Sequence, residues 1–370
     1  MKVVLGCSRI ANCMGNRKHL INNLISKGHE VLITYYESPH NIKLLDNVRY
    51  QQLQASRNSI TILGDIRLLL HYIRLFLVER PDIYHSYTTK PNIYGTIAAK
   101  LTFVKGVYPV INGLGDSYTI IESRTGYRSA AFRFLYRMSF ALSSKVFFQN
   151  QHDLNLLADT AMVNRDKCIY IAGSGIDLKE HHYIPYTNKK LSFLMASRLV
   201  KSKGVIDYCE AARILKKQYQ EVEFVLCGRF ENGLNGISES DLSPYINDSS
   251  IIYKGHVDNI NHQIADCLAF ILPTYYREGV PHSILEAMAI GRAVLTTDMP
   301  GCTETVIEGY NGFIIQPKRI EALTEKMTWF INNVNETVDM GKNSRKLAER
   351  VFDVRAVNKT ILRNIGICKT

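Results

Sequence analysis

The stretch that decides the fold is "YYREGVPHSILEAMAIGRAVLTTDMPGCTETV", residues 275–306. It follows the short apolar run "FILP", which is typical of a buried parallel strand. Pro281 suits the first position of a helix, because the backbone N–H that proline lacks would be unpaired there. The helix is expected to end before Gly291. A strand, a loop and a helix in this order indicate a parallel sheet covered by helices.

The same alternation runs through the whole chain in two series. Apolar runs such as "KVVLGC", "EVLITYY" and "VYPVIN" alternate with amphipathic stretches in the first half, and "LSFLMASRLV", "VEFVLCGRF" and "RAVLTTD" do so in the second. A chain of 370 residues also fits two domains better than one. We therefore predict an α/β fold of two doubly wound, Rossmann-like domains, with a hinge at residues 174–190. Ligands are expected at the carboxyl ends of the strands, in the cleft where the domains face each other.

Composition limits the class of protein. The eight cysteines form no C-x-x-C pair, which disfavours zinc and thioredoxin-like sites and indicates a reduced, cytoplasmic protein. "MKVVLGCSRI" is predicted to be a first strand and not a signal peptide. No apolar run approaches the roughly 18 residues that a membrane-spanning helix needs.

Charge is distributed unevenly along the chain. The net charge is +11, and residues 1–175 hold 21 Lys and Arg against 11 Asp and Glu. A basic half predicts an anionic partner, such as nucleic acid, anionic lipid or a phosphorylated substrate. A charge that serves only solubility explains the count equally well. No recognised nucleic-acid-binding module is present, so nucleic acid is not expected as a partner.

Two glutamates flank the predicted helix start after "FILP". The helix N-terminus carries partial positive charge and unpaired N–H groups, so it can hold a phosphate. Glu278 precedes the helix, and Glu286 lies about 7 Å along the axis from Pro281. The two carboxylates are therefore placed to bind hydroxyl groups on either side of a diphosphate, as in a sugar nucleotide. The alternative is two solvated surface glutamates.

Three other strand ends carry residues suited to a nucleotide. "ASRLVKSKG" (196–204) places Arg198 and Lys203 where they would neutralise a diphosphate, although such a pair is often only surface charge. "CGRF" with Gly228 and "GHVDNI" with Val257 are candidates for the wall around a nucleobase and ribose. There is no D-x-D motif, G-x-G-x-x-G motif or Walker A loop, so we predict neither a metal nor a separate cofactor.

Together these motifs resemble family 4 retaining glycosyltransferases of the GT-B fold, of the bacterial surface-polysaccharide type. In the second half, "SRLVKSKG", residues 277–306 and "GYNGFIIQP" carry the resemblance. In the first half, "HSYTTKPNIYGTIAAKL", "VINGLGDSYT", "VFFQNQHDLNLL" and "GSGIDL" do so. The resemblance implies an acceptor-binding domain at 1–180, a nucleotide-sugar-binding domain at 181–352, and a C-terminal helix at about 353–370 that packs back on the first domain.

The resemblance also implies roles for single residues. The first glutamate of the pair binds hydroxyls of the donor sugar and acts in catalysis, the second binds the ribose, and the Arg/Lys pair grips the diphosphate. These roles fall on Glu278, Glu286, Arg198 and Lys203. The residues expected to approach the donor phosphates or the sugar through their backbone are Gly15, Gly279 and Val280.

One position departs from the family pattern. Many relatives carry a histidine after a strand of the first domain, near the donor sugar, whereas "YPVI" here leads into Asn112. Asn112 stays a candidate catalytic residue, because its amide can accept a hydrogen bond from a sugar hydroxyl and donate one, but an amide cannot serve as a general base. This favours a front-face reaction in which the departing phosphate takes the acceptor's proton. His85 is a second polar candidate near the cleft, with a structural role as its alternative.

The residues between 122 and 140 mix four arginines with aromatic residues, which is typical of a helix that lies on an anionic membrane. The alternative is a core helix with a solvated basic face. "DIRLLLHYIRLFLVER" (65–80) is a second candidate for membrane contact, but a buried helix is the simpler interpretation.

We expect a metal-independent enzyme that transfers a sugar, with retention, from a nucleotide sugar to an acceptor. A UDP-sugar is favoured, and the acceptor is expected to be a polyprenyl-diphosphate-linked glycan in O-antigen or capsule assembly. The enzyme is expected to be cytoplasmic, peripheral on the inner face of the cytoplasmic membrane, and held there through its first domain. The alternatives are a nucleotide-sugar epimerase of the same fold and a non-catalytic subunit that binds a glycan or nucleotide sugar.

Overall fold

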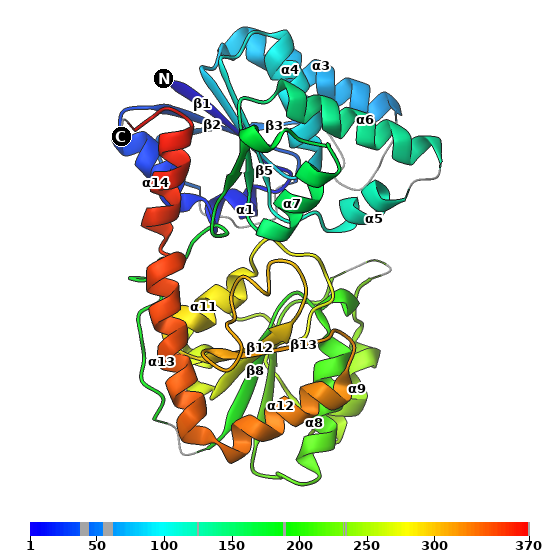
Figure 1. The fold of residues 1–370 in the computed structure, drawn as a ribbon, viewed down its shortest axis with the longest axis vertical. Coiled ribbons are helices and arrows are strands. Elements are labelled where there is room, and N and C mark those ends of the chain that lie inside the picture. Colours follow the sequence, from blue (N-terminus) through cyan, green and yellow to red (C-terminus); the bar gives the residue numbers. More distant parts are fainter. Residues whose placement is uncertain are drawn as a thin grey trace. The chain divides into compact units, whose positions relative to one another are not determined.

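The protein is a pair of parallel α/β units in a computed structural model that describes residues 1–37, 44–54, 62–123, 126–187, 190–231, 233 and 235–368. One unit comprises residues 1–175 and 354–370, and the other comprises residues 176–353. Figure 1 shows the secondary structure of each unit. The chain passes from the first unit to the second inside the predicted hinge and returns at residue 354.

The N-terminal unit contains a seven-stranded sheet in the order β3-β2-β1-β4-β5-β6-β7, in which every strand pair is parallel. The order of the strands reverses between β1 and β4, which makes this pair the switch point of the sheet. The strands are β1 Lys2–Gly6, β2 Glu30–Tyr35, β3 Val48–Gln52, β4 Ile83–Tyr87, β5 Gly106–Ile111, β6 Val146–Phe148 and β7 Cys168–Tyr170.

Helices cover both faces of this sheet. Each strand offers apolar side chains to both faces, because successive residues of a strand point to opposite sides. Val3 and Leu5 pack with α2 and α14 on one face, whereas Val4 packs with α3 and α4 on the other. A third cluster joins α4, α6 and α7. The helices are α1 Ile10–Met14, α2 Lys18–Ser26, α3 Ile62–Glu79, η1 Pro91–Gly95, α4 Thr96–Leu101, α5 Asp116–Glu122, α6 Tyr127–Leu142, α7 Gln151–Asp159, η2 Arg165–Lys167 and α14 Val354–Asn364.

The last helix of the chain belongs to the core of the first unit. Figure 1 shows α14 against α2, at opposite ends of the colour scale. Ile361 and Leu362 of α14 are each 4% exposed and share one apolar cluster with Leu20 and Leu24 of α2. The N-terminal unit is therefore incomplete without the C-terminal residues.

The second unit holds a six-stranded sheet in the order β10-β9-β8-β11-β12-β13, again with parallel pairs only. Its switch point lies between β8 and β11. The strands are β8 Ser192–Ala196, β9 Glu223–Cys227, β10 Ile252–Tyr253, β11 Ala269–Leu272, β12 Ala293–Thr297 and β13 Gly312–Ile315. The helices are η3 Lys201–Lys203, α8 Val205–Lys216, α9 Glu239–Asn247, α10 Asn261–Asp266, α11 His282–Ile290, α12 Ile320–Asn332 and α13 Val334–Val351.

The predicted fold class is confirmed, since each unit is a doubly wound parallel sheet with helices on both faces. Within the described ranges, no helix combines the length and apolar character needed to cross a membrane.

We predict that Ile361→Ala destabilises the N-terminal unit by about 2–5 kcal/mol, because it leaves a cavity between α14 and α2. Native-state hydrogen exchange measures this unit by unit. Amides of β1 and α2 should exchange faster in the variant, while those of β8 and β11 keep their rates. Lys359→Ala, at an exposed position of the same helix, is the matched control and should change neither set. Unchanged exchange in β1 and α2 of the Ile361 variant would contradict the core role of α14.

Candidate functional site

Most of the predicted residues follow strands that lie at or near the switch point of their own sheet. In the second unit, Arg198 and Lys203 follow β8, and Glu278 follows β11, the adjacent strand across the switch point. In the first unit, Gly15 follows β1, and Asn112 follows β5. Loops diverge at a switch point and leave a crevice beyond the strand ends, which is where open α/β sheets bind ligands.

The two loops of the second unit are fastened to each other by their backbones. The carbonyl of Ser202 accepts from the Tyr275 N–H at 2.9 Å and from the Thr274 hydroxyl at 3.0 Å. Gly204 has a φ of 74°, and a Cβ atom there would lie 2.1 Å from the carbonyl oxygen of Pro273. Only glycine allows this approach. The turn that carries Lys203 is therefore held against the loop that carries Glu278.

Lys203 and Glu278 form an ion pair across this junction. Their side chains are 12% and 17% exposed, so solvent screens the pair less than it would an exposed one. An ammonium group has three N–H donors, and Glu278 accepts from one of them. Two residues 75 positions apart in the sequence thus form one charged group at the switch point.

Helix α11 begins one residue later than predicted. Pro281 is its N-cap, and the Pro281 carbonyl accepts from the N–H groups of Ile284 and Leu285 at 3.1 and 3.3 Å. Gly291 ends the nine-residue helix in the left-handed conformation, with φ 94°. The positive end of the helix dipole therefore lies just after Glu278.

Glu286 lies on α11 beside a histidine that the sequence prediction did not include. Its Oε1 is 3.1 Å from Nδ1 of His282, one helical turn earlier. The side chains of Glu286 and His282 are 21% and 29% exposed. An i, i+4 spacing was the available signal, since residues four apart face each other on a helix. The pair restricts the Glu286 carboxylate and leaves part of it open to solvent.

Arg292 fixes the other end of α11. It is 1% exposed, and its guanidinium donates to the carbonyls of Ile184, Ile264, Ala265 and Gly291 at 2.6 to 2.9 Å. Burial lowers the pKa of Arg292. Carbonyl groups at the C-terminal ends of α10 and α11 supply the negative charge that stabilises it.

The predicted nucleobase wall lies at the ends of neighbouring strands. Gly228 follows β9, its N–H donates to the Gly255 carbonyl at 2.8 Å, and a Cβ atom there would lie 2.0 Å from the Ser197 carbonyl oxygen. Val257 is half-buried in the loop after β10, and Arg198 is exposed. A Cβ atom on Gly301 would lie 1.7 Å from the Gly279 carbonyl oxygen, so the loop after β12 supports the Glu278 loop from behind.

In the first unit, Arg17 links the predicted positions, and sequence reasoning missed it. Its guanidinium donates to Asn112 Oδ1 at 3.1 Å, to Asn16 O at 3.2 Å and to the Ser174 hydroxyl. It also lies 4.5 Å from the centre of the Tyr87 ring, in cation–π contact. Arg17 is 8% exposed. The only available signal was an arginine two residues after Gly15, because its burial cannot be read from local sequence.

The hydrogen bond from Arg17 determines which group of the Asn112 amide remains available to a ligand. Because the guanidinium donates to Oδ1, the Nδ2 group of Asn112 is the part that remains available as a donor. Asn112 is half-buried, and the loop after it is held where the Leu114 N–H donates to Asp153 Oδ2 at 2.9 Å. Gly15 is exposed at the C-cap of α1, and its φ of −78° lies outside the left-handed region that favours glycine.

His85 lies inside β4 and is fully buried. Its Nδ1 is 2.7 Å from the carbonyl oxygen of Tyr108, so Nδ1 carries the proton and donates. Burial lowers the pKa of His85 to about 4, and the ring is therefore neutral near pH 7. Its ring contacts Tyr87 and Phe147 edge-on. This position favours the structural alternative.

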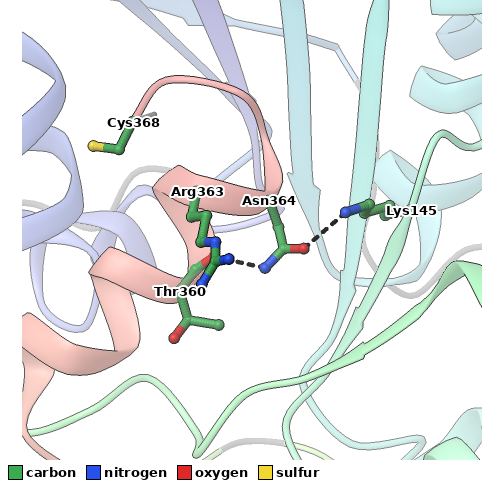
Figure 2. Close-up of a pocket in the computed structure, with 5 residues that line it drawn as sticks. All are labelled: Lys145, Thr360, Arg363, Asn364 and Cys368. Carbon is green, nitrogen blue, oxygen red and sulfur yellow. Dashed lines mark hydrogen bonds between the residues drawn. The ribbon is translucent and has the colours of Figure 1, made fainter. Parts of the chain in front are cut away.

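A cavity of about 430 Å³ lies elsewhere in the first unit. Figure 2 shows its lining, in which Lys145 donates to Asn364 Oδ1 at 2.8 Å, and Thr360, Arg363 and Cys368 complete the wall. Lys145 precedes β6, whereas Asn112 follows β5, so the cavity opens at the opposite edge of the sheet. It is therefore separate from the predicted residues.

Two doubly wound units, with site residues at the carboxyl edge of each sheet, define the GT-B class of glycosyltransferases. Family models agree along most of the chain: "Glycosyl transferases group 1" matches residues 180–347, and "Glycosyl transferase 4-like" matches residues 14–150. The chain therefore belongs to the group 1, family 4-like glycosyltransferases.

Characterised relatives match nearly the whole chain. It is 27% identical over 350 residues to N,N'-diacetylbacillosaminyl-diphospho-undecaprenol alpha-1,3-N-acetylgalactosaminyltransferase of Campylobacter jejuni, covering 89% of both chains. It is 24% identical over 328 residues to the capsular polysaccharide biosynthesis glycosyltransferase CapM of Staphylococcus aureus, covering 85% of this chain and 84% of CapM. UDP-Gal:alpha-D-GlcNAc-diphosphoundecaprenol alpha-1,3-galactosyltransferase of Escherichia coli is 23% identical over 355 residues, covering 90% of this chain and 85% of that enzyme.

Solved structures agree on the fold. Sucrose-phosphate synthase from Thermosynechococcus elongatus superposes with a TM-score of 0.80 at 16% identity, covering 98% of this chain and 97% of that one. HepE from Anabaena in complex with UDP gives 0.76 at 18% identity, covering 99% and 100%.

We predict that Lys203→Ala weakens UDP binding about tenfold to a hundredfold, because one charge-assisted hydrogen bond contributes about 1.5–3 kcal/mol. Isothermal titration calorimetry measures the change. Lys201→Ala is the matched control, since Lys201 has the same charge, lies two residues earlier in η3 and is exposed. Equal affinities in the two variants would contradict the assignment of Lys203. Unchanged thermal unfolding would show that the loss is local.

We predict that His85→Asn reduces the acid sensitivity of the N-terminal unit. Because the folded pKa of about 4 lies below the unfolded value near 6.5, the unfolded chain binds the extra proton between these pH values. Wild-type stability should therefore fall as pH drops below about 6.5, by up to about 1.4 kcal/mol per pH unit from this group. Chemical denaturation at several pH values measures the slope. An unchanged slope, or a selective rise in acceptor KM, would contradict the structural role.

Proposed function

We propose that this glycosyltransferase moves a sugar from a UDP-sugar to a polyprenyl-diphosphate-linked glycan, with retention of configuration, in surface-polysaccharide assembly. The observation that carries the proposal is the Lys203–Glu278 pair, fixed at the switch point immediately before the N-terminus of α11. Cationic and carboxylate groups side by side suit a molecule that joins a diphosphate to a sugar.

The names of relatives support the class of acceptor. The relatives from C. jejuni and E. coli are both named for acceptors that join a sugar to undecaprenol through a diphosphate, and the E. coli enzyme is also named for UDP-Gal. CapM is named for capsular polysaccharide biosynthesis. A lipid-linked acceptor implies work at the inner face of the cytoplasmic membrane, so we include peripheral membrane association in the proposal.

The diphosphate is held by protein groups in this proposal. Lys203 keeps two N–H donors beyond the one given to Glu278, and the N-terminal end of α11 adds a positive dipole. Arg198, exposed after β8, supplies a second cation. Three sources of positive charge stabilise the departing nucleoside diphosphate, which is the reason for proposing a reaction independent of added metal.

The carboxylates bind the two ends of the donor. A carboxylate has about four lone-pair sites, so Glu278 can accept from a sugar hydroxyl while it pairs with Lys203. Glu286, oriented by His282, accepts from the ribose hydroxyls. These interactions orient the donor, and precise orientation lowers the barrier of a bimolecular step.

The reaction needs no protein base. The acceptor hydroxyl oxygen forms a bond to C1 of the donor sugar on the face from which the diphosphate leaves, and the bond between C1 and the β-phosphate oxygen breaks. The hydroxyl proton passes to an oxygen of the leaving phosphate. Asn112, whose Oδ1 accepts from Arg17, contributes an N–H donor to this proposal and not a base. Gly15, Gly228, Val257, Gly279 and Val280 contribute backbone or wall contacts to the donor.

Incubation with a polyprenyl-diphosphate-linked sugar and a panel of UDP-, GDP- and ADP-sugars tests the proposal. We expect one UDP-sugar to give a product that keeps the donor's anomeric configuration by NMR, with activity that survives EDTA. Glu286→Gln should raise donor KM about tenfold or more, and Glu308→Gln, at an exposed glutamate of the same unit, should not.

Each other outcome contradicts part of the proposal. Conversion of the donor without an acceptor indicates the epimerase, and binding without turnover indicates the non-catalytic subunit. An inverted product excludes the front-face reaction. Activity lost on chelation and restored by manganese or magnesium would show that an ion holds the diphosphate.

A further inference from the structure

Helix α3 exposes an unusual number of large aliphatic side chains. Leu63, Ile66, Leu70, Leu77 and Val78 are 83%, 49%, 57%, 59% and 72% exposed. At 100° per residue they fall within an arc of about 120° that runs the length of the helix. Contiguous apolar surface of this kind marks a binding site more often than a solvated face.

The opposite face of α3 packs normally. Leu68 and Tyr72 are fully buried, and Phe76 is 1% exposed; all three belong to the core cluster beneath the helix. The helix is therefore apolar on two faces, and the core accounts for only one of them. The sequence favoured a buried helix over membrane contact for this stretch, and the exposed arc shows that burial describes only one of the two apolar faces.

The exposed charged side chains on the outer face of α3 are all positive. Arg67 and Arg74 are exposed between the aliphatic residues of the arc. The two acids of the helix point elsewhere: Asp65 pairs with Lys90 at 2.9 Å, and Glu79 pairs with Arg49 at 2.6 Å and with Lys2 at 3.0 Å. The exposed arc thus combines aliphatic side chains with cations alone.

The neighbouring helix carries the same combination. Helix α4 packs against α3 (Figure 1). Its last residue, Leu101, is 59% exposed, and Phe103 just after it is 90% exposed. Phe103 has φ 60°, a left-handed conformation that a bulky residue adopts at some cost. Lys100 and Lys105 flank these two residues in the sequence. The apolar and basic character therefore extends beyond a single helix.

Helix α6, which the sequence favoured for membrane contact, packs differently. Tyr136 and Phe140 are 2% and 0% exposed in a core cluster. Arg133 donates to the Ser123 carbonyl and to the Ser129 hydroxyl. Tyr127 and Phe134 remain 77% and 65% exposed, while Arg124 and the side chain of Arg128 lie outside the described residues. Only part of the aromatic face of α6 thus belongs to the core.

The whole N-terminal unit is more basic than the first half of the sequence. Residues 1–175 and 354–370 hold 25 Lys and Arg against 11 Asp and Glu, a net charge of +14, because the C-terminal segment adds four cations and no acid. Residues 176–353 hold 20 against 23, a net charge of −3. The field around this unit attracts anionic surfaces.

We propose that the exposed arc of α3 is the surface through which this chain docks on a bilayer containing anionic lipid. The aliphatic residues enter the boundary between headgroups and acyl chains, and Arg67 and Arg74 bind lipid phosphates. The proposal rests on the proposed function to the extent that a lipid-linked acceptor requires a membrane. A bilayer fits better than a protein partner, because the exposed charged side chains of the arc are all cations and the unit as a whole carries a net charge of +14, which suits a surface of uniform negative charge.

Vesicle co-sedimentation of the full chain tests this surface. Wild type should bind vesicles of phosphatidylcholine with phosphatidylglycerol and bind pure phosphatidylcholine weakly. Rising salt should weaken binding to the anionic vesicles without abolishing it, since salt screens charge but not apolar burial. Wild-type protein that ignores anionic vesicles at low salt overturns the proposal.

Variants separate the two contributions. Leu70→Gln with Leu77→Gln should weaken binding about tenfold or more, and Arg67→Glu with Arg74→Glu should remove most of the preference for anionic lipid. Ile214→Gln with Ile246→Gln is the matched control, because these aliphatic residues are 46% and 39% exposed on helices of the other unit. Equal binding by the leucine variant and its control overturns the proposal.

Two further readouts identify a different occupant or a failed function. If sedimentation velocity shows a wild-type dimer that the leucine variant breaks, the arc covers a second copy of this chain and the proposal is wrong. Activity on a short soluble acceptor should be unchanged in all three variants. Lipid-linked turnover without vesicle binding overturns the docking surface alone, whereas vesicle binding without any turnover overturns the proposed function alone.

Discussion

The hydrogen bonding of the buried Arg292 guanidinium is the interaction on which the second unit depends. The guanidinium draws together the C-terminal ends of α10 and α11 and the segment at Ile184 by donating to carbonyl groups, and it also lies 5.7 Å from the centre of the Tyr186 ring. A cation with such partners is stable because both helix dipoles present their negative ends to it. The opposite, positive end of α11 is thereby fixed beside Glu278. Arg292 thus lies just after the C-terminal end of α11, and the candidate site lies at the N-terminal end of the same helix.

The two candidate sites share a way of holding polar groups. In the second unit, the close approach at Gly204 sets Lys203 against Glu278. In the first unit, Arg17 orients the Asn112 amide. Each polar group that faces the site is held by a second polar group behind it, and rotamer freedom is lost before a ligand arrives. Such preorganisation reduces the entropy that binding must otherwise overcome.

The local sequence predicted the strands and helices but not the hydrogen-bond partners of the buried side chains. The alternation of apolar runs predicted both sheets, and Pro281 and Gly291 bracketed α11 to within one residue. Burial of Arg17 and Arg292 was not predictable, because an arginine is ordinarily a surface residue and only the fold brings carbonyls or an amide to it. Helix α3 was misjudged for a related reason: an apolar pattern shows which faces avoid water, but not which face meets the core. The roles assigned to the individual site residues stay predictions.

The place of α14 has a consequence for synthesis on the ribosome. Val357, Ile361 and Leu362 complete the core around β1 and α2, yet they follow all of residues 176–353 in the chain. Domains generally fold as units while the nascent chain emerges. Here all of the second unit is synthesised before the last helix of the first, so the core of the unit that is synthesised first is completed last. Until α14 has been made, the apolar side of α2 lacks that helix as a partner.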